Sequence, residues 1–290
     1  MTRHRLFNAC SFWPVLCRCS AVFSVAVVGS ILFFLLYFCV PLFDRDTLSK
    51  LLTWDWRPFQ GHFGILPMIA GSFFLSISAL ILAFPVSLGI CCFVHGMGAP
   101  RLGSYALRLI KLMTSIPTVV YGFVGVFVLI PLIRDVFQHG SGFSWIAATI
   151  GLAVLILPTI VLMLHTQFSL IESQVSLTAS ALGMTTAQRL LYLVIPASRK
   201  GFIAAAVLGY GRAVGDTMIP LMLAGNAPQL PESFFDSLRT MSAHIALVVA
   251  ADTQSLAYLS LFACGLFLFL NTIFVNVGLR ILMKGSEQGV

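Results

Sequence analysis

Apolar residues in this 290-residue sequence are gathered into long runs that shorter polar segments separate. A run of about 20 apolar residues is long enough to cross a bilayer as a helix. Pro is tolerated inside such runs, because neighbouring helices satisfy the backbone groups that it frees. The pattern predicts an all-α, polytopic membrane protein with six transmembrane helices, at Ala21–Val40, Ile65–Phe93, Leu112–Ile133, Ile146–Leu164, Gly201–Gly225 and Tyr258–Leu282.

The N-terminal region divides into a basic leader, residues 1–20, and a segment at residues 21–43 that contains the first predicted helix. A cleaved signal peptide is the alternative interpretation, but its apolar part spans about 7–15 residues and ends in small residues. The run here is longer and ends in LYFCVPLF, which favours a retained anchor. The other five helices lie within residues 65–285, a core that includes a long polar loop at residues 167–200.

The basic residues predict the orientation in the membrane. Eleven of the 17 Lys and Arg residues lie in the leader, in the 95–111 and 165–200 loops and at the C-terminal end. Only five lie in the opposite loops. Since loops rich in Lys and Arg stay on the cytoplasmic side, we expect both termini to be cytoplasmic. This distribution accounts for the formal net charge of +7 without a nucleic-acid partner.

The sequence carries none of the common short motifs of enzymes. It contains no G-x-x-x-x-G-K-[ST], H-E-x-x-H or G-x-S-x-G. We therefore expect no catalytic residues, no metal site and no cofactor in this chain, so that any ATP would be bound by a separate subunit. His95, His139 and His244 are interpreted as loop or interface residues. Cys17 and Cys19 lack the second His/Cys pair that a zinc site needs.

One arginine lies inside the fifth predicted helix. At the helical rise, Arg212 is about 16 Å along the helix from Gly201, near the middle of a hydrocarbon core about 30 Å thick. A charge there is costly and should face protein or a water-filled cavity. Its planar fork of donors matches an oxyanion such as phosphate. Asp216 falls one turn later, about 6 Å away between Cβ atoms, where it can neutralise Arg212. The pair either lines a substrate path or is purely structural.

Hydroxyl groups near the start of the third predicted helix can line the same path as neutral donors. A structural role is the alternative for each of them. These residues are Thr114, Ser115, Thr118 and Tyr121.

The loop TASALGMTTAQRLLYLVIP, Thr178–Pro196, resembles the cytoplasmic signature of ABC importer permeases. The resemblance implies a short helix, a turn at a Gly and a second helix, which together dock in a cleft of the ATPase subunit. The usual acidic residue of the signature falls on Leu177, and the nearest carboxylate is Glu172. This departure puts the strength of the ATPase contact in question. The residues that match the signature are Ala179, Ala181, Leu182, Gly183, Ile195 and Pro196.

Three further segments are similar to the C-type permease subunits of high-affinity phosphate ABC importers. They are SIPTVVYGFVGVFVLIPLIR (Ser115–Arg134), GYGRAVGDTMIPLMLAGN (Gly209–Asn226) and RTMSAHIA (Arg239–Ala246). Asp216 stands where that family usually has Glu. The resemblance implies a MetI-like permease fold in the inner membrane. It also implies four kinds of partner: a homologous second permease, a dimer of ATP-binding subunits, an extracytoplasmic phosphate-binding protein and membrane lipid. Two alternatives stay open, namely transport of molybdate or sulfate and a signalling or scaffold protein that has lost transport.

Overall fold

A computed structural model of the protein describes residues 3–138, 140–249 and 255–284. The first two residues of the basic leader and the last residue of the 65–285 core lie outside this range. Most of the described chain is helical. The α-helices are α1 (Arg3–Cys39), α2 (Arg45–Leu51), α3 (Leu66–Cys92), α4 (Pro100–Met113), α5 (Thr118–Val124), α6 (Ile130–Phe137), α7 (Trp145–Ala181), α8 (Thr186–Arg189), α9 (Ile195–Ala197), α10 (Arg199–Gly215), α11 (Met218–Leu223), α12 (Met241–Val248) and α13 (Leu256–Lys284).

Short irregular elements connect these helices. A two-stranded antiparallel sheet, β1 (Trp56–Arg57) and β2 (His62–Phe63), pairs Trp56 with Phe63 after α2. Segments η1 (Val40–Phe43) and η2 (Pro58–Gln60) are 3₁₀ turns. Segments η3 (Phe93–Met97), η4 (Gly125–Leu129) and η5 (Leu190–Val194) are π-helical turns.

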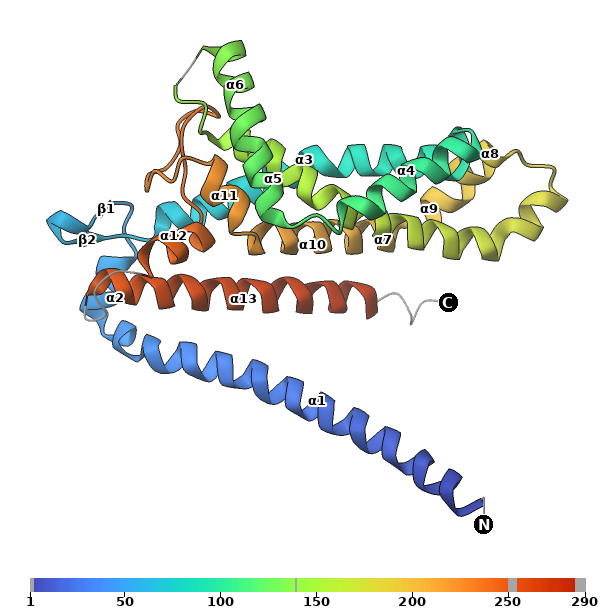
Figure 1. Cartoon of the computed structure of the whole chain (residues 1–290), viewed down its shortest axis with the longest axis horizontal. Helices are drawn as coiled ribbons and strands as arrows, with labels where there is room; N and C mark the ends of the chain where they lie inside the picture. The colour runs from blue at the N-terminus through green and yellow to red at the C-terminus, as the bar shows by residue number, and fades with distance from the viewer. Residues whose placement is uncertain (1–2, 139, 250–254, 285–290) are drawn as a thin grey trace.

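Five helical segments of the described chain are long and apolar enough to cross a membrane. A sixth span is obtained when the pair Thr186–Ala197 and Arg199–Gly215, bent by 69°, counts as one. Helices α3, α7, α10 and α13 run side by side, and α1 diverges from them toward its N-terminus (Figure 1). The fold is therefore an all-α bundle of a polytopic membrane protein. The five unbroken segments are Trp13–Cys39, Leu66–Gly96, Thr118–Phe137, Trp145–Ala181 and Leu256–Ile281.

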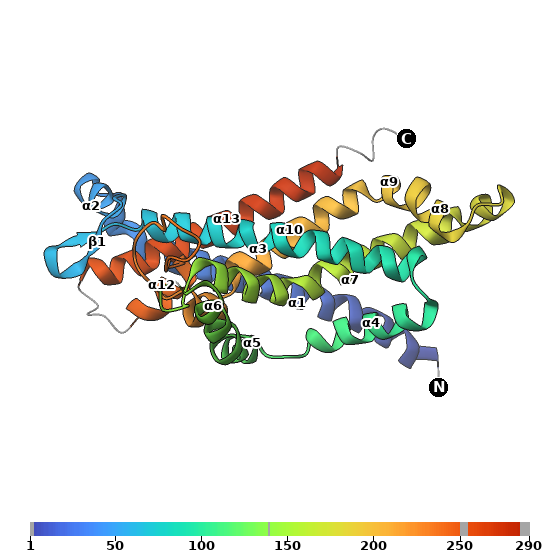
Figure 2. The ribbon, with the colours of Figure 1, turned by 90° about the horizontal axis from the view of Figure 1, so that it is seen from above.

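The centre of the bundle is formed by α3, α7 and α10, which run close together in Figure 2. Helix α7 buries a stripe of branched side chains that includes Leu152, Ile156 and Ile160. Helix α10 meets this stripe with small residues. A Cβ at Gly209 would lie 2.8 Å from Ile160, so the close approach of the two helices requires glycine there. Small residues allow tight helix packing in a membrane, where burial of apolar surface gives little driving force.

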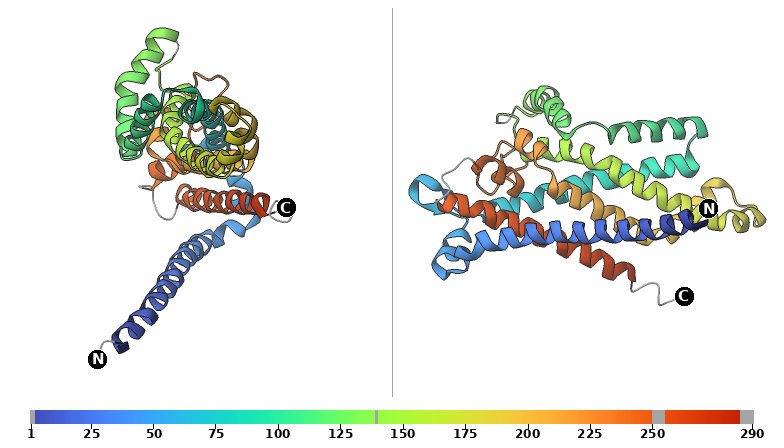
Figure 3. Two further views of the ribbon diagram at one scale, coloured as in Figure 1. Left: turned by 90° about the vertical axis from the view of Figure 1, so that its right-hand side faces the viewer. Right: turned by 60° about the horizontal axis from the view of Figure 1, so that its bottom comes forward.

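Helix α1 lies apart from this centre. Seen end-on, it swings away from the bundle toward its N-terminus (Figure 3). It packs against α13 near its C-terminal end, where Phe38 stacks on Phe262 with ring centroids 4.7 Å apart. From Trp13 onward, most of its apolar side chains are exposed. In a membrane protein such a face meets lipid or another transmembrane helix.

The third predicted helix, Leu112–Ile133, differs from the structure at its start. Helix α4 ends at Met113, and a turn follows before α5 begins at Thr118. Pro117 causes this break, because a proline disfavours the helical conformation of the residue before it. The spanning segment therefore begins six residues later than expected and extends to Phe137.

The fourth predicted helix, Ile146–Leu164, continues much further than the apolar run. Helix α7 extends to Ala181, so the first half of the polar 167–200 loop is helical. No Pro or Gly interrupts the chain between Pro158 and Gly183.

The prediction of one continuous helix over Gly201–Gly225 is wrong. Helix α10 ends at Gly215, and Asp216 adopts an extended conformation before α11. The cause is Pro220, whose ring would clash in a continuous helix with the carbonyl of the residue four positions earlier, Asp216. That carbonyl instead accepts a hydrogen bond from Ser242 Oγ at 2.9 Å.

The short helix α11 packs tightly against α5 and α7. A Cβ at Gly122 would lie 2.6 Å from Met222 Sδ, and one at Gly125 would lie 2.8 Å from Leu223. Glycine is therefore required on α5 and η4 for this approach. The packing holds the break at Asp216 deep between the spans.

Candidate functional site

Arg212 lies in the last turn of α10 with its side chain exposed in the single chain. Its Nη1 donates a hydrogen bond to Thr159 Oγ1 on α7 at 3.2 Å. Within the described part of the chain, the guanidinium forms no ion pair with a carboxylate. Its charge acts electrostatically on Tyr121 and Asp216. Arg212 is thus a cation whose nearest hydrogen-bond partner is a neutral hydroxyl.

A cavity of about 210 Å³ adjoins Arg212 between α10 and α13. Sequence reasoning missed its polar residues on α13. A signal for them existed, because polar side chains inside an apolar span are rare and commonly functional. The polar residues that line the cavity are Tyr210, Arg212, Asn271, Thr272 and Asn276.

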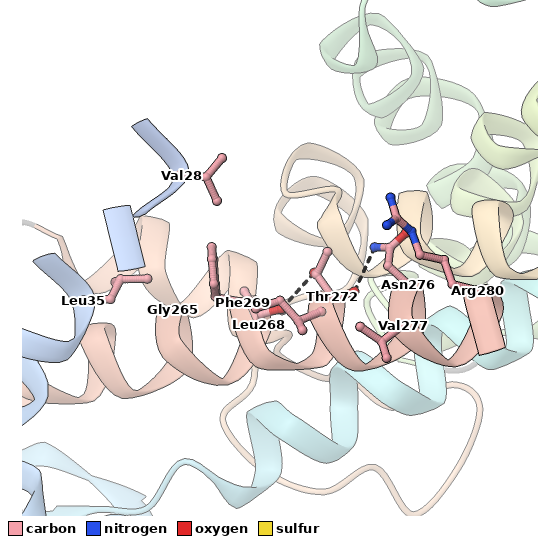
Figure 4. A pocket seen from close by; sticks show the side chains of 10 residues that line it. Val28, Leu35, Gly265, Leu268, Phe269, Thr272, Asn276, Val277 and Arg280 are labelled. Atoms are coloured by element: carbon pink, nitrogen blue, oxygen red, sulfur yellow. Dashed lines mark hydrogen bonds between the residues drawn. The ribbon is translucent and has the colours of Figure 1, made fainter. Parts of the chain in front are cut away.

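A larger cavity of about 600 Å³ lies between α1 and α13 (Figure 4). Its wall is mainly apolar, but Thr272, Asn276 and Arg280 on α13 also line it. Asn276 Nδ2 donates to the Thr272 carbonyl at 2.8 Å, and the side chains of Asn276 and Arg280 lie beside each other in Figure 4. Thr272 and Asn276 border both cavities. A polar stripe on α13 therefore extends from the surroundings of Arg212 toward the C-terminal end of the helix.

Asp216 forms no ion pair with Arg212 among the described residues, although the Arg212 charge acts on its carboxylate. Asp216 follows the end of α10, and its Oδ2 accepts a hydrogen bond from the Ile219 backbone N–H at 2.9 Å. The side chain is buried, and from the position before the N-cap Thr217 it satisfies one free N–H in the first turn of α11. The Pro220 break changes the direction of the chain at this residue, which removes the spacing on which the pairing depended.

The predicted hydroxyl donors occupy the break between α4 and α5. Tyr121 Oη donates to the Met113 carbonyl at 2.8 Å and so closes the turn. Thr118 is the first residue of α5, and Ser115 is exposed in the turn. Thr114 Oγ1 donates to the Lys111 carbonyl at 2.7 Å. Among the described residues, no hydrogen bond joins any of these side chains to Arg212.

The segment at residues 177–196, called the coupling segment below for its proposed role, has the helix–turn–helix form that the resemblance implies. Helix α7 ends at Ala181, and Gly183 adopts a left-handed conformation with φ of 67°. Thr185 and Gln188 then cap α8 by reciprocal side-chain to backbone hydrogen bonds. The first helix is not short, because it is the continuation of α7. A Cβ at Gly183 would meet no other atom within 4 Å, so the site has space for a side chain. Glycine is needed there because of the left-handed backbone conformation.

The other residues of the signature lie on both sides of this turn. Ala179 is buried, and its carbonyl accepts from the Met184 N–H at 3.0 Å. The side chains of Leu177 and Leu182 are 85% and 71% exposed, so two leucines project from the tip of the segment. Ile195 and Pro196 form α9, directly before the bend into α10.

Two histidines interpreted as loop or interface residues are buried instead. The side chain of His95 is 5% exposed and contacts Glu172 and His165. His244 is fully buried on α12, where its Nε2 lies 3.0 Å from Ser260 Oγ. Burial, with the Arg239 charge as a smaller cause, lowers the pKa of His244 to about 3. His139 lies outside the described residues.

Comparison with known proteins supplies an independent line of observation. The family model described as "Binding-protein-dependent transport system inner membrane component" matches residues 96–287. The probable ABC transporter permease protein YqgH of Bacillus subtilis is 34% identical over 209 residues, which cover 71% of this chain and 67% of that protein. The phosphate transport system permease protein PstC of Pasteurella multocida is 28% identical over 292 residues, covering 93% and 90% of the two chains.

Solved structures show the same fold. A chain from inward-facing conformations of the MetNI methionine ABC transporter superposes with a TM-score of 0.58 at 13% identity, covering 83% of this chain and 98% of that one. A chain of a bacterial ABC transporter involved in the import of the acidic polysaccharide alginate superposes with a TM-score of 0.56 at 13% identity, covering 96% and 99%.

Proposed function

Because this chain belongs to the family of binding-protein-dependent transport system inner membrane components and is a transmembrane permease of an ABC importer, we propose that it conducts inorganic phosphate into the cell. It is a multi-pass protein of the inner (plasma) membrane. The PstC relatives, which are phosphate transport permeases by name, support the choice of phosphate.

The single observation that carries the proposal is the state of Arg212. The guanidinium has one neutral partner, Thr159, and a polar cavity beside it. An unpaired charge in the middle of a bilayer must face protein or water, yet Arg212 is exposed in the single chain. This exposure supports a path between this chain and a second, homologous permease. There the fork of Arg212 would receive a phosphate oxyanion through two parallel hydrogen bonds.

Other predicted path residues take supporting roles in this proposal. Tyr121 holds the turn that begins α5, and Asp216 holds the start of α11. Ser115 and Thr118 lie at the same break and would face the phosphate path as neutral donors. The two breaks therefore shape the region around Arg212.

The energy for transport would come from a dimer of ATP-binding subunits, which hold the ATP. The helix–turn–helix at residues 177–196 is the proposed contact with one of these subunits, and its exposed Leu177 and Leu182 would give the contact an apolar component. An extracytoplasmic phosphate-binding protein would deliver the substrate to the opposite side. Helix α8 of the coupling segment lies at one end of the bundle, and β1, β2 and α12 lie at the other (Figure 1). This arrangement supports an ATPase contact at the first end and substrate delivery at the second.

The test is ATP-dependent uptake of radiolabelled phosphate by membrane vesicles that contain the chain with its partner subunits. We expect uptake to disappear when the chain is omitted and to return when it is restored. An excess of sulfate or molybdate should leave uptake unchanged. Competition by either anion at a concentration similar to that of phosphate would favour a broader oxyanion permease. Assembly of the complex without uptake of any of the three anions would favour a scaffold.

A further inference from the structure

A cluster of charged and imidazole side chains connects the coupling segment to the membrane helices. Glu172 on α7 contacts His95 of η3 through Oε2 and Nδ1 at 2.8 Å. The other carboxylate oxygen accepts from Arg189 Nη2 of α8 at 3.4 Å. His95 Nε2 lies 2.8 Å from Nδ1 of His165, which is also on α7. Glu172 therefore links its own helix, α7, to η3 and to α8. Helix α8 belongs to the second half of the coupling segment.

The hydrogen bonding assigns a direction to these contacts. An ionised carboxylate only accepts hydrogen bonds, so His95 donates from Nδ1 whether or not its ring is charged. When His95 is neutral, its Nε2 accepts from the Nδ1–H of His165. Lys111 on α4 adds a further positive charge that acts on this group. Glu172 is thus the only acidic group among the described members of the cluster and the one that holds the others together.

Backbone packing brings the same elements together. Segment η3 continues α3 directly, and it contacts α8 through Gly96. A Cβ at Gly96 would lie 3.1 Å from both the Thr186 carbonyl and Leu190 Cδ2. Helix α8 therefore packs against η3 at the end of α3. A displacement of α8 would change this contact and so act on the α3 span.

We propose that Glu172 is a positioning residue that fixes α8 to α3 and α7, so that movement of the coupling segment is passed to the membrane helices. This inference rests on the proposed function, since it assumes that the ATPase subunit moves α8. It assigns to Glu172 an internal role. Both of its oxygens are already engaged by His95 and Arg189, so it does not replace the acidic residue that is absent at Leu177.

The contacts of Glu172 differ in length between α8 and η3. The contact between Arg189 and Glu172 is long for a charge-assisted hydrogen bond, and Arg189 Nε is buried without a hydrogen-bond partner. The carboxylate of Glu172 therefore has a short contact with His95 and a longer contact with Arg189 of α8.

The experiment compares four forms of the assembled complex: wild type, Glu172→Gln, Arg189→Gln and the double variant. Hydrogen exchange of the backbone amides at 186–197 reports how firmly α8 is held. Loss of a charged hydrogen bond should raise exchange there by about tenfold in Glu172→Gln. The double variant should exchange no faster than Glu172→Gln alone, because both changes remove the same pair. The amides of α13 should be unaffected, which shows that the bundle remains folded.

The ratio of phosphate transported to ATP hydrolysed is measured on the same samples. We expect it to fall about tenfold in Glu172→Gln while the complex still assembles and hydrolyses ATP. The matched control is Arg101→Gln, which removes an exposed cytoplasmic cation of α4 outside the cluster. Exchange and transport ratio equal to those of Arg101→Gln would overturn the proposal.

The inference and the proposed function fail in different ways. If the wild-type complex imports no phosphate, the phosphate assignment is contradicted. If the Glu172→Gln complex nevertheless exchanges faster than wild type at 186–197, the positioning role is supported. Normal phosphate import with unchanged exchange in Glu172→Gln would do the reverse.

Discussion

The charged groups at Glu172 and at Arg212 are paired to different extents. Both carboxylate oxygens of Glu172 are engaged, by His95 and Arg189. Arg212 has a single hydroxyl partner, Thr159, and a cavity beside it. The hydrogen bonds of Glu172 are used within the protein and hold helices together. Donors of Arg212 that are not used within the protein can bind a ligand. The comparison separates a region that holds the fold from a region that is open to an anion.

Breaks in the helices explain why Arg212 stays open. The turn between α4 and α5 and the turn between α10 and α11 each follow from a proline, Pro117 and Pro220. At the second break the Asp216 carboxylate accepts from the Ile219 N–H at the start of α11 and forms no ion pair with Arg212 among the described residues. Discontinuous helices at membrane depth are tolerated only where they are covered by protein or line a cavity. The loss of the expected ion pair is therefore what leaves Arg212 available.

The largest effect is expected from Arg212→Lys, which tests whether the open region contacts the anion. Lys keeps the charge but loses the planar fork, so phosphate uptake per assembled complex should fall roughly tenfold to a hundredfold, as a lost charge-assisted hydrogen bond implies. The control is Arg199→Lys, an exposed arginine in the first turn of the same helix. Equal uptake by the two variants would assign Arg212 a structural role.

A smaller effect, roughly tenfold in transport per ATP hydrolysed, is expected from Gly183→Val. The left-handed conformation at φ of 67° costs about 1–3 kcal/mol for a non-glycine residue, and most for a β-branched one. ATP hydrolysis should continue, because the spans and the ATPase are unchanged. Gly183→Asn is the matched control, since Asn tolerates this conformation and the site has space for a side chain. Similar loss in both variants would show that the turn geometry is not the cause.

The smallest effect is expected at Asp216, where the cap and the counter-ion roles can be separated. Asp216→Ala removes the acceptor for the Ile219 N–H and should lower the free energy of unfolding by about 1 kcal/mol. Asp216→Asn keeps an oxygen that accepts this bond, so it should retain most of the stability and uptake. Thermal unfolding of the purified complex and phosphate uptake measure the two properties. A loss of uptake in the Asn variant as large as in the Ala variant, with the melting temperature preserved, would restore the counter-ion role.

The features that the sequence alone predicted depend on local composition. The six apolar runs are recognised by their length. The turn at Gly183 was expected from the resemblance to ABC importer permeases, and the conformational freedom of glycine is its physical basis. Arg212 is recognised as a candidate because a charge inside an apolar run is unusual in any tertiary arrangement. The boundaries were less certain. The effect of Pro117 and Pro220 on a long apolar run depends on whether neighbouring helices can satisfy the freed backbone groups, and the sequence does not show which neighbours are present.

The tertiary structure decided which distant residues meet. His95 and Glu172 are 77 positions apart, and Arg212 reaches Thr159 across 53 positions. No local period links such pairs, so His95 resembles an ordinary loop residue in the sequence. The polar stripe of Thr272 and Asn276 gains its meaning in the same way, from the packing of α13 beside α10. The sequence determined which apolar segments enter the membrane and that the chain can turn at Gly183, because these depend on solvation and backbone freedom. Helix packing alone decided which charges are satisfied and which stay open.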